Sequence, residues 1–65
     1  GPLTARERQV LELIADGKNS HDIGSLLGIS HKTADVHRAN LMRKLEIRSV
    51  SELVRYAIRN KLVEA

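Results

Sequence analysis

The chain has 65 residues, no cysteine and a formal net charge of +3 at pH 7. A chain this short has room for one domain with one small core, which excludes a large enzyme with a deep cleft. Without cysteine it forms neither a disulfide nor a thiolate metal cluster, so helix packing must stabilise the fold. Because Tyr56 is the only Phe, Tyr or Trp, we expect an aliphatic core.

The sequence carries no signal for a membrane or for export. No apolar run approaches the 18 or so residues that span a bilayer, and no signal-peptide pattern is present. We therefore expect a cytoplasmic protein that makes no membrane contact. Gly1 and Pro2 resemble a cloning remnant left by tag cleavage, which leaves residues 3–65 as the expected single domain.

Positive charge is concentrated in the second half of the chain. Residues 1–29 carry a formal charge of −1, whereas residues 30–65 carry +4. A basic half beside a mildly acidic half is typical of proteins with a polyanionic partner such as nucleic acid, and a merely solvated surface is the alternative.

The first two expected helices are delimited by capping residues and glycines. Helical periodicity runs along the whole chain without competing strand-like alternation. Thr4 and Glu7 predict a capping box before a helix at about 5–16, which Gly17 ends. The residues expected to face the core from this helix are Val10, Leu11 and Ile14.

A short second helix is expected at about 21–27, with Ser20, or alternatively Asn19, as its N-cap. Gly28 is expected to end it. Gly24 costs about 1 kcal/mol relative to alanine in a helix interior. A helix crossing closely over this glycine would explain it. The side chains expected to face inward are Ile23, Leu26 and Leu27.

The third helix is expected at about 31–45 with Ser30 as its cap, and the fourth at about 50–61. Ser49 and Glu52 predict a second capping box. The third helix has an apolar stripe of Ala34, Leu41 and Leu45, and the fourth has an arc of Val50, Leu53, Val54, Ala57 and Ile58. These elements predict an all-α fold, a compact four-helix bundle.

The middle of the chain has the pattern of a helix-turn-helix. A short turn with Gly28 joins the second helix to a longer and more basic third helix. In this motif the second of the two helices enters the DNA major groove, although any helical corner can mimic the pattern.

The outward face of the third helix favours the DNA interpretation. On a helical wheel Lys32, Ala39 and Arg43 surround Val36, with Asp35 to one side and the apolar stripe opposite. A carboxylate accepts a hydrogen bond from cytosine, and a small apolar side chain packs on the thymine methyl group. We therefore expect these five residues to face bases. A solvated helix face is the alternative, but it leaves an exposed valine unexplained.

Over residues 3–63 the sequence resembles the LuxR/NarL-type helix-turn-helix domains. The segments that carry the resemblance are residues 3–7, 10–17, 29–33, 36–45 and 52–58. The resemblance implies a bacterial four-helix DNA-binding domain that is usually the C-terminal output module of a transcription regulator. The most similar subfamily is that of two-component response regulators.

This resemblance implies base contacts at Asp35, Val36 and Ala39. Asp35 and Ala39 depart from the commonly basic residues at their positions, so readout by arginine or lysine is not implied there. The resemblance also implies phosphate contacts, to which the wheel adds the neighbouring His37 and Asn40. The expected phosphate contacts are Asn19, Ser20, Thr33, His37, Asn40 and Lys44.

Double-stranded DNA is thus the expected partner, and a domain this small is expected to bind it in pairs on two-fold related half-sites. The resemblance points to the fourth helix as the dimer surface, where Glu52, Tyr56 and Arg59 lie off the core arc. RNA polymerase is a further candidate partner. A protein-interaction module is the alternative function, and a membrane-surface element is disfavoured because the apolar faces are committed to a core.

Other kinds of site are disfavoured. The spacing of His21, His31 and His37 does not place two of them at i, i+4 on one helical face, which disfavours a metal site, and the first two are expected to be exposed. Neither a Gly-rich phosphate loop nor a Ser/His/Asp constellation is recognisable, so we expect no enzyme, no cofactor and no small-molecule ligand. Arg38 lies near the core side and is expected to pair with Glu7, with a phosphate contact as the alternative.

Overall fold

The computed structural model describes residues 3–63, and this part of the chain contains no strand. Gly1 and Pro2, interpreted above as a cloning remnant, lie outside the described residues. The helices are α1 (Ala5–Ala15), α2 (Ser20–Leu27), α3 (His31–Lys44) and α4 (Val50–Arg59). The all-α prediction is confirmed, and each helix begins and ends within two residues of its expected bounds.

Side-chain caps define where the helices begin. The capping box of α1 is confirmed: the Glu7 amide donates to Thr4 Oγ1 at 3.1 Å and the Thr4 amide donates to Glu7 Oε1 at 2.8 Å. Of the two candidates for α2, Asn19 is the N-cap and forms a reciprocal capping box with Asp22.

The second predicted capping box is only half formed. The Glu52 amide donates to Ser49 Oγ at 3.2 Å, but the Glu52 carboxylate accepts from the amide of Arg48 instead of that of Ser49. The two N-cap residues also differ in backbone conformation, because Ser49 has a φ of −140° and Thr4 a φ of −69°.

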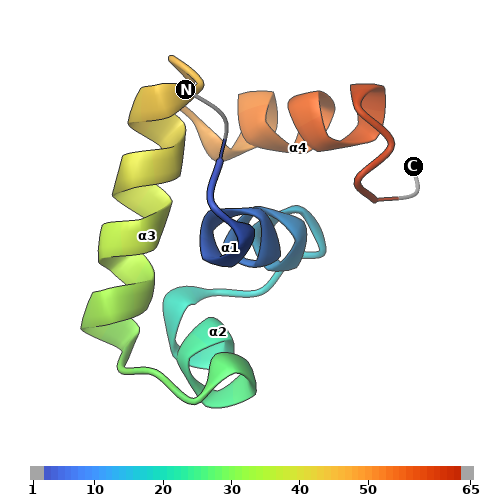
Figure 1. The fold of residues 1–65 in the computed structure, drawn as a ribbon. Coiled ribbons are helices and arrows are strands. Elements are labelled where there is room, and N and C mark those ends of the chain that lie inside the picture. Colours follow the sequence, from blue (N-terminus) through green and yellow to red (C-terminus); the bar gives the residue numbers. More distant parts are fainter. Residues whose placement is uncertain (1–2, 64–65) are drawn as a thin grey trace.

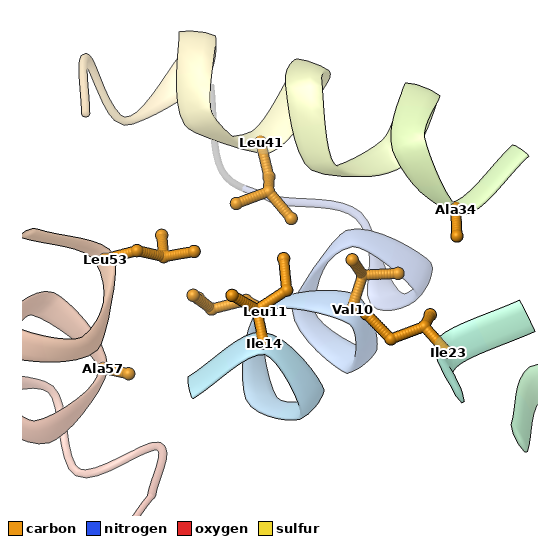
Figure 2. Packing of buried hydrophobic residues seen from close by; sticks show 8 residues of the cluster. All are labelled: Val10, Leu11, Ile14, Ile23, Ala34, Leu41, Leu53 and Ala57. Atoms are coloured by element: carbon orange, nitrogen blue, oxygen red, sulfur yellow. The ribbon is translucent and has the colours of Figure 1, made fainter. Parts of the chain in front are cut away.

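The four helices are arranged around α1, which packs against each of the other three (Figure 1). In Figure 1, α1 lies between α2 and α4, and α3 runs past its side. Aliphatic side chains from all four helices meet in the middle (Figure 2). The core is therefore aliphatic, as predicted, and consists of Val10, Leu11, Ile14, Ile23, Ala34, Leu41, Leu53 and Ala57.

Three predicted core positions are wrong. Leu26 is 59% exposed, Val50 39% and Ile58 38%. Leu26 lies about 100° around the helix from the centre of the narrow stripe that α2 buries. Val50 and Ile58 flank the Leu53 and Ala57 side of α4, the only part of the predicted arc that is fully buried in the described chain.

The close approach that would explain Gly24 is present, but the turn after α2 and the first residue of α3 make it, and not a helix that crosses over Gly24. A Cβ atom at Gly24 would lie 2.6 Å from the carbonyl oxygen of Ile29, in the turn that follows α2. The amide of Ile29 donates to the carbonyl of Gly24 at 2.9 Å. The chain thus folds back tightly on α2, and Gly28, with a left-handed φ of 69°, makes this reversal possible.

Candidate nucleic-acid interface

The turn between α2 and α3 is held by local hydrogen bonds. Ser30 is the N-cap of α3: its hydroxyl accepts from the Thr33 amide at 3.1 Å and lies 3.0 Å from Thr33 Oγ1. At the other end of the turn, the Gly28 amide donates to the Gly24 carbonyl. These bonds fix the direction in which α3 leaves α2.

The two faces of α3 are oriented as predicted. Ala34 and Leu41 are 1% and 0% exposed and point into the core (Figure 2). Val36, in contrast, is 57% exposed. The other residues predicted to face bases are exposed as well, namely Lys32, Asp35, Ala39 and Arg43. The structure thus gathers all five on one exposed side of α3.

The residues predicted to contact phosphate lie around this exposed side. Asn19, Thr33 and Lys44 are exposed, and Ser20, His37 and Asn40 are half-buried. Some of them already have partners in the protein. The Asn19 side-chain carbonyl caps α2, so its amide nitrogen is the group left to donate.

Two hydrogen bonds join the predicted base-facing and phosphate-facing groups. Arg43 Nη2 donates to Asn40 Oδ1 at 2.7 Å, one turn apart on α3. The Ser20 hydroxyl at the start of α2 donates to Asp35 Oδ1 on α3. Neither bond was predicted from the sequence, and the second depends on the packing angle between two helices.

Lys44, not Arg38, forms the ion pair with Glu7. Lys44 Nζ lies 2.8 Å from Glu7 Oε1, and the Glu7 side chain is 6% exposed. The hydrogen bond from Lys44, together with that from the Thr4 amide, holds the pKa of Glu7 below its usual value. The predicted pair was wrong because a helical wheel gives angles and not heights: Lys44 lies about 9 Å further along the axis than Arg38.

Charge on the candidate interface is largely uncompensated. Within residues 3–63 the ion pairs are Lys18–Asp16, at 3.9 Å, and Lys44–Glu7. Lys32, Arg43 and Arg48 therefore have no carboxylate within ion-pair distance in the described part of the chain. Cations of this kind attract a polyanion.

The histidines have an arrangement that the sequence analysis missed. His21 and His31 are exposed, as expected, but their rings stack with centroids 4.3 Å apart and an interplanar angle of 23°. His21 is the second residue of α2 and His31 is the first residue of α3, and the tight turn brings the two helix starts together. Residues 3–63 contain no cluster of three potential metal ligands, and none of their helices is long and apolar enough to cross a membrane.

Comparisons with known proteins identify the family of the chain. The family model described as bacterial regulatory proteins, luxR family, matches residues 1–57. The transcriptional regulatory protein UhpA of Escherichia coli K12 is 54% identical over 54 residues, which are 83% of this chain and 28% of UhpA. The uncharacterized response regulatory protein YgeK of the same strain is 47% identical over 57 residues, which are 88% of this chain and 39% of YgeK.

The oxygen regulatory protein NreC of Staphylococcus epidermidis RP62A is 44% identical over 62 residues, 95% of this chain and 28% of NreC. The chain thus spans between 28% and 39% of the length of these relatives. The match to the family model covers most of the chain and includes the whole helix-turn-helix. The chain belongs to the luxR family of bacterial regulatory proteins and is a DNA-binding helix-turn-helix domain of transcription regulation.

Proposed function

We propose that this domain binds double-stranded DNA sequence-specifically, as the output domain of a two-component response regulator in the bacterial cytoplasm, with α3 in the major groove. The observation that carries the proposal is the exposed side of α3, where Val36 projects between Lys32 and Arg43 while Leu41 is buried. A regulatory domain outside this chain would control access to DNA, and the domain itself would act by binding and not by catalysis.

The proposed contacts divide into two groups. Bases would be read by the exposed side of α3, that is Lys32, Asp35, Val36, Ala39 and Arg43. Phosphates would be bound at its edges and at the start of α2, by Asn19, Thr33, His37, Asn40 and Lys44. The Ser20 hydroxyl, expected above to contact phosphate, already donates its proton to Asp35. For Lys44 this role competes with Glu7, which already binds its ammonium group.

The proposal is tested by measuring binding to random duplex DNA at several salt concentrations. If three to five phosphates are neutralised, log K should fall against log salt with a slope of about −0.9 per phosphate. A salt-independent affinity would contradict the proposal. It would favour a protein-interaction module instead, to which an exposed Val36 is equally suited.

Selection from a random duplex library then separates specific from non-specific binding. Val36→Ala should change the preferred base at one position, with about 1–3 kcal/mol of discrimination lost, and leave the salt slope unchanged. Equal loss on every duplex would show that Val36 makes no base contact.

We also propose that two domains pair through α4 on DNA, with RNA polymerase as a further partner of the assembled regulator. Glu52, Tyr56 and Arg59 are the proposed polar contacts on one side of α4. The opposite side of α4 is the alternative pairing surface, an apolar stripe with a spacing of four residues, Val50, Val54 and Ile58, whose ends are 39% and 38% exposed. Burial of this stripe against its symmetry mate would stabilise the pair.

A further inference from the structure

The hydrogen bond between Ser20 and Asp35 joins the two helices of the helix-turn-helix on their exposed side. Ser20 is the first residue of α2, and Asp35 lies in the second turn of α3, 15 residues later. Such a bond restricts the rotation of an exposed carboxylate that would otherwise sample several rotamers. Asp35 is therefore held in one orientation before any partner binds.

The bond also changes what Ser20 can do. A serine hydroxyl has a single proton to donate. Because this proton goes to Asp35, Ser20 cannot at the same time donate to a DNA phosphate, the role that the resemblance implied for it. In this arrangement Ser20 acts on DNA through Asp35.

Asp35 itself is a carboxylate in a cationic neighbourhood. Neither ion pair of residues 3–63 includes it, so its negative charge has no cationic partner there, and Oδ2 has no hydrogen-bond donor from this part of the chain. Near DNA this charge is repelled by phosphates, so it lowers the affinity for every duplex. If the Asp35 carboxylate benefits DNA recognition, it has to do so by making binding more selective between base sequences.

A carboxylate accepts hydrogen bonds and donates none. In the major groove, guanine and thymine present acceptors, and adenine presents its N6 donor beside the N7 acceptor. Cytosine differs from adenine because it presents its N4 donor there without an acceptor of its own. We propose that Ser20 is a positioning residue that holds Asp35 so that its carboxylate selects cytosine at one position of the target. This inference rests on the proposed function.

The experiment measures, for each protein variant, the discrimination for cytosine and the affinity for random duplexes. A library selection with the wild-type domain first defines the preferred duplex. Dissociation constants are then determined for that duplex and for variants that replace the cytosine, at one salt concentration. The protein variants are Ser20→Ala, Asp35→Ala, the double variant, and Ser20→Thr, which keeps the hydroxyl.

The wild-type domain should discriminate about 5- to 150-fold for cytosine, the range of a single good base contact. Asp35→Ala should remove this discrimination and tighten binding to random duplexes. Ser20→Ala should weaken the discrimination without weakening binding to random duplexes, and the double variant should lose no more than Asp35→Ala. Ser20→Thr should restore the wild-type ratio.

Two outcomes would overturn the inference while leaving the proposed function intact. One is a Ser20→Ala variant that binds all duplexes equally less well and still prefers cytosine, as expected of a phosphate contact. The other is a wild-type preference that does not change in Asp35→Ala. Absence of salt-dependent duplex binding by the wild-type domain would instead refute the proposed function. Circular dichroism melting of each variant tests whether a change in affinity comes from unfolding of the domain.

Discussion

At the scale of single residues, Glu7 is the one buried polar side chain of residues 3–63, and it joins α1 to α3. It is 4% exposed and caps the start of α1 together with Thr4. It also forms an ion pair with Lys44, the last residue of α3. A charge is buried at a tolerable cost when it is paired and hydrogen-bonded, and Glu7 satisfies both conditions. The pair fixes the C-terminal end of α3 to α1, while the turn at Gly28 fixes the other end to α2.

Replacing Glu7 should reveal the pH dependence of this connection. The pKa of Glu7 is lowered in the folded protein, first by Lys44 and then by the Thr4 amide. The folded-state pKa thus lies below the unfolded value of about 4.3, so the pair stabilises the fold above that pH and this stabilisation is lost as pH falls through the folded-state pKa. Glu7→Gln should therefore melt at a lower temperature than the wild type at pH 7, and the gap should narrow below about pH 4.

Glu12→Gln is the matched control, because Glu12 lies on the same helix and belongs to neither ion pair of residues 3–63. Its melting temperature should follow that of the wild type at each pH. A gap between Glu7→Gln and the wild type that stays constant from pH 7 to pH 3 would show that Glu7 stabilises the fold by packing and not by its charge.

At the scale of helices, the sequence predicts long elements better than short ones. The 14 residues of α3 form almost four turns, so the position of its buried stripe was well determined, and Val36 and Leu41 lie on opposite sides as predicted. The eight residues of α2 form little more than two turns, and Leu26 was placed on the wrong side. A short helix offers too few apolar positions to locate its buried stripe.

Contacts between helices were predicted least well. The bond from Ser20 to Asp35, the stack of His21 on His31 and the pairing of Lys44 with Glu7 all depend on crossing angles and on axial offsets. Local sequence patterns specify neither quantity. The candidate interface was therefore predictable as a set of exposed residues on α3, but not as a set of hydrogen-bonded groups.

The apolar stripe on α4 leads to a prediction about pairing. Ile58→Lys places a charge where two copies of α4 would meet, and an unpaired charge in an interface is costly. We expect binding to a duplex with two half-sites to weaken by about tenfold or more, whereas binding to a single half-site stays the same. Mobility-shift titrations on the two duplexes, with sedimentation of the complexes, measure both effects.

Leu26→Lys is the control for this substitution, because Leu26 is also an exposed apolar residue but lies on α2. Leu26→Lys should leave unchanged the ratio between the affinity for the duplex with two half-sites and the affinity for the single half-site. If Ile58→Lys behaves in the same way, the apolar stripe does not contribute to pairing, and the Glu52, Tyr56 and Arg59 side of α4 becomes the surface to test.

At the scale of the whole molecule, a small aliphatic core has to hold a DNA-reading surface in shape. A domain of this size has a free energy of unfolding of roughly 3–10 kcal/mol. Eight buried apolar residues form its core, and α1 lies at their centre (Figure 2). From α3, Ala34 and Leu41 belong to this core and Met42 packs against it, so Leu41 is the largest fully buried side chain that this helix contributes.

Truncation to alanine should therefore lower the stability of the fold strongly at Leu41 and hardly at all at Val36. Leu41→Ala removes a side chain that is 0% exposed and should destabilise the fold by about 2–5 kcal/mol, a large part of the total. Val36→Ala changes a side chain that is 57% exposed and should shift the stability by no more than about 0.5 kcal/mol. Because DNA binds only the folded domain, saturating duplex should raise the melting temperature of Leu41→Ala. Thermal melting with and without duplex measures both variants, and an equal loss of stability in both would mean that α3 is not oriented with Leu41 inward.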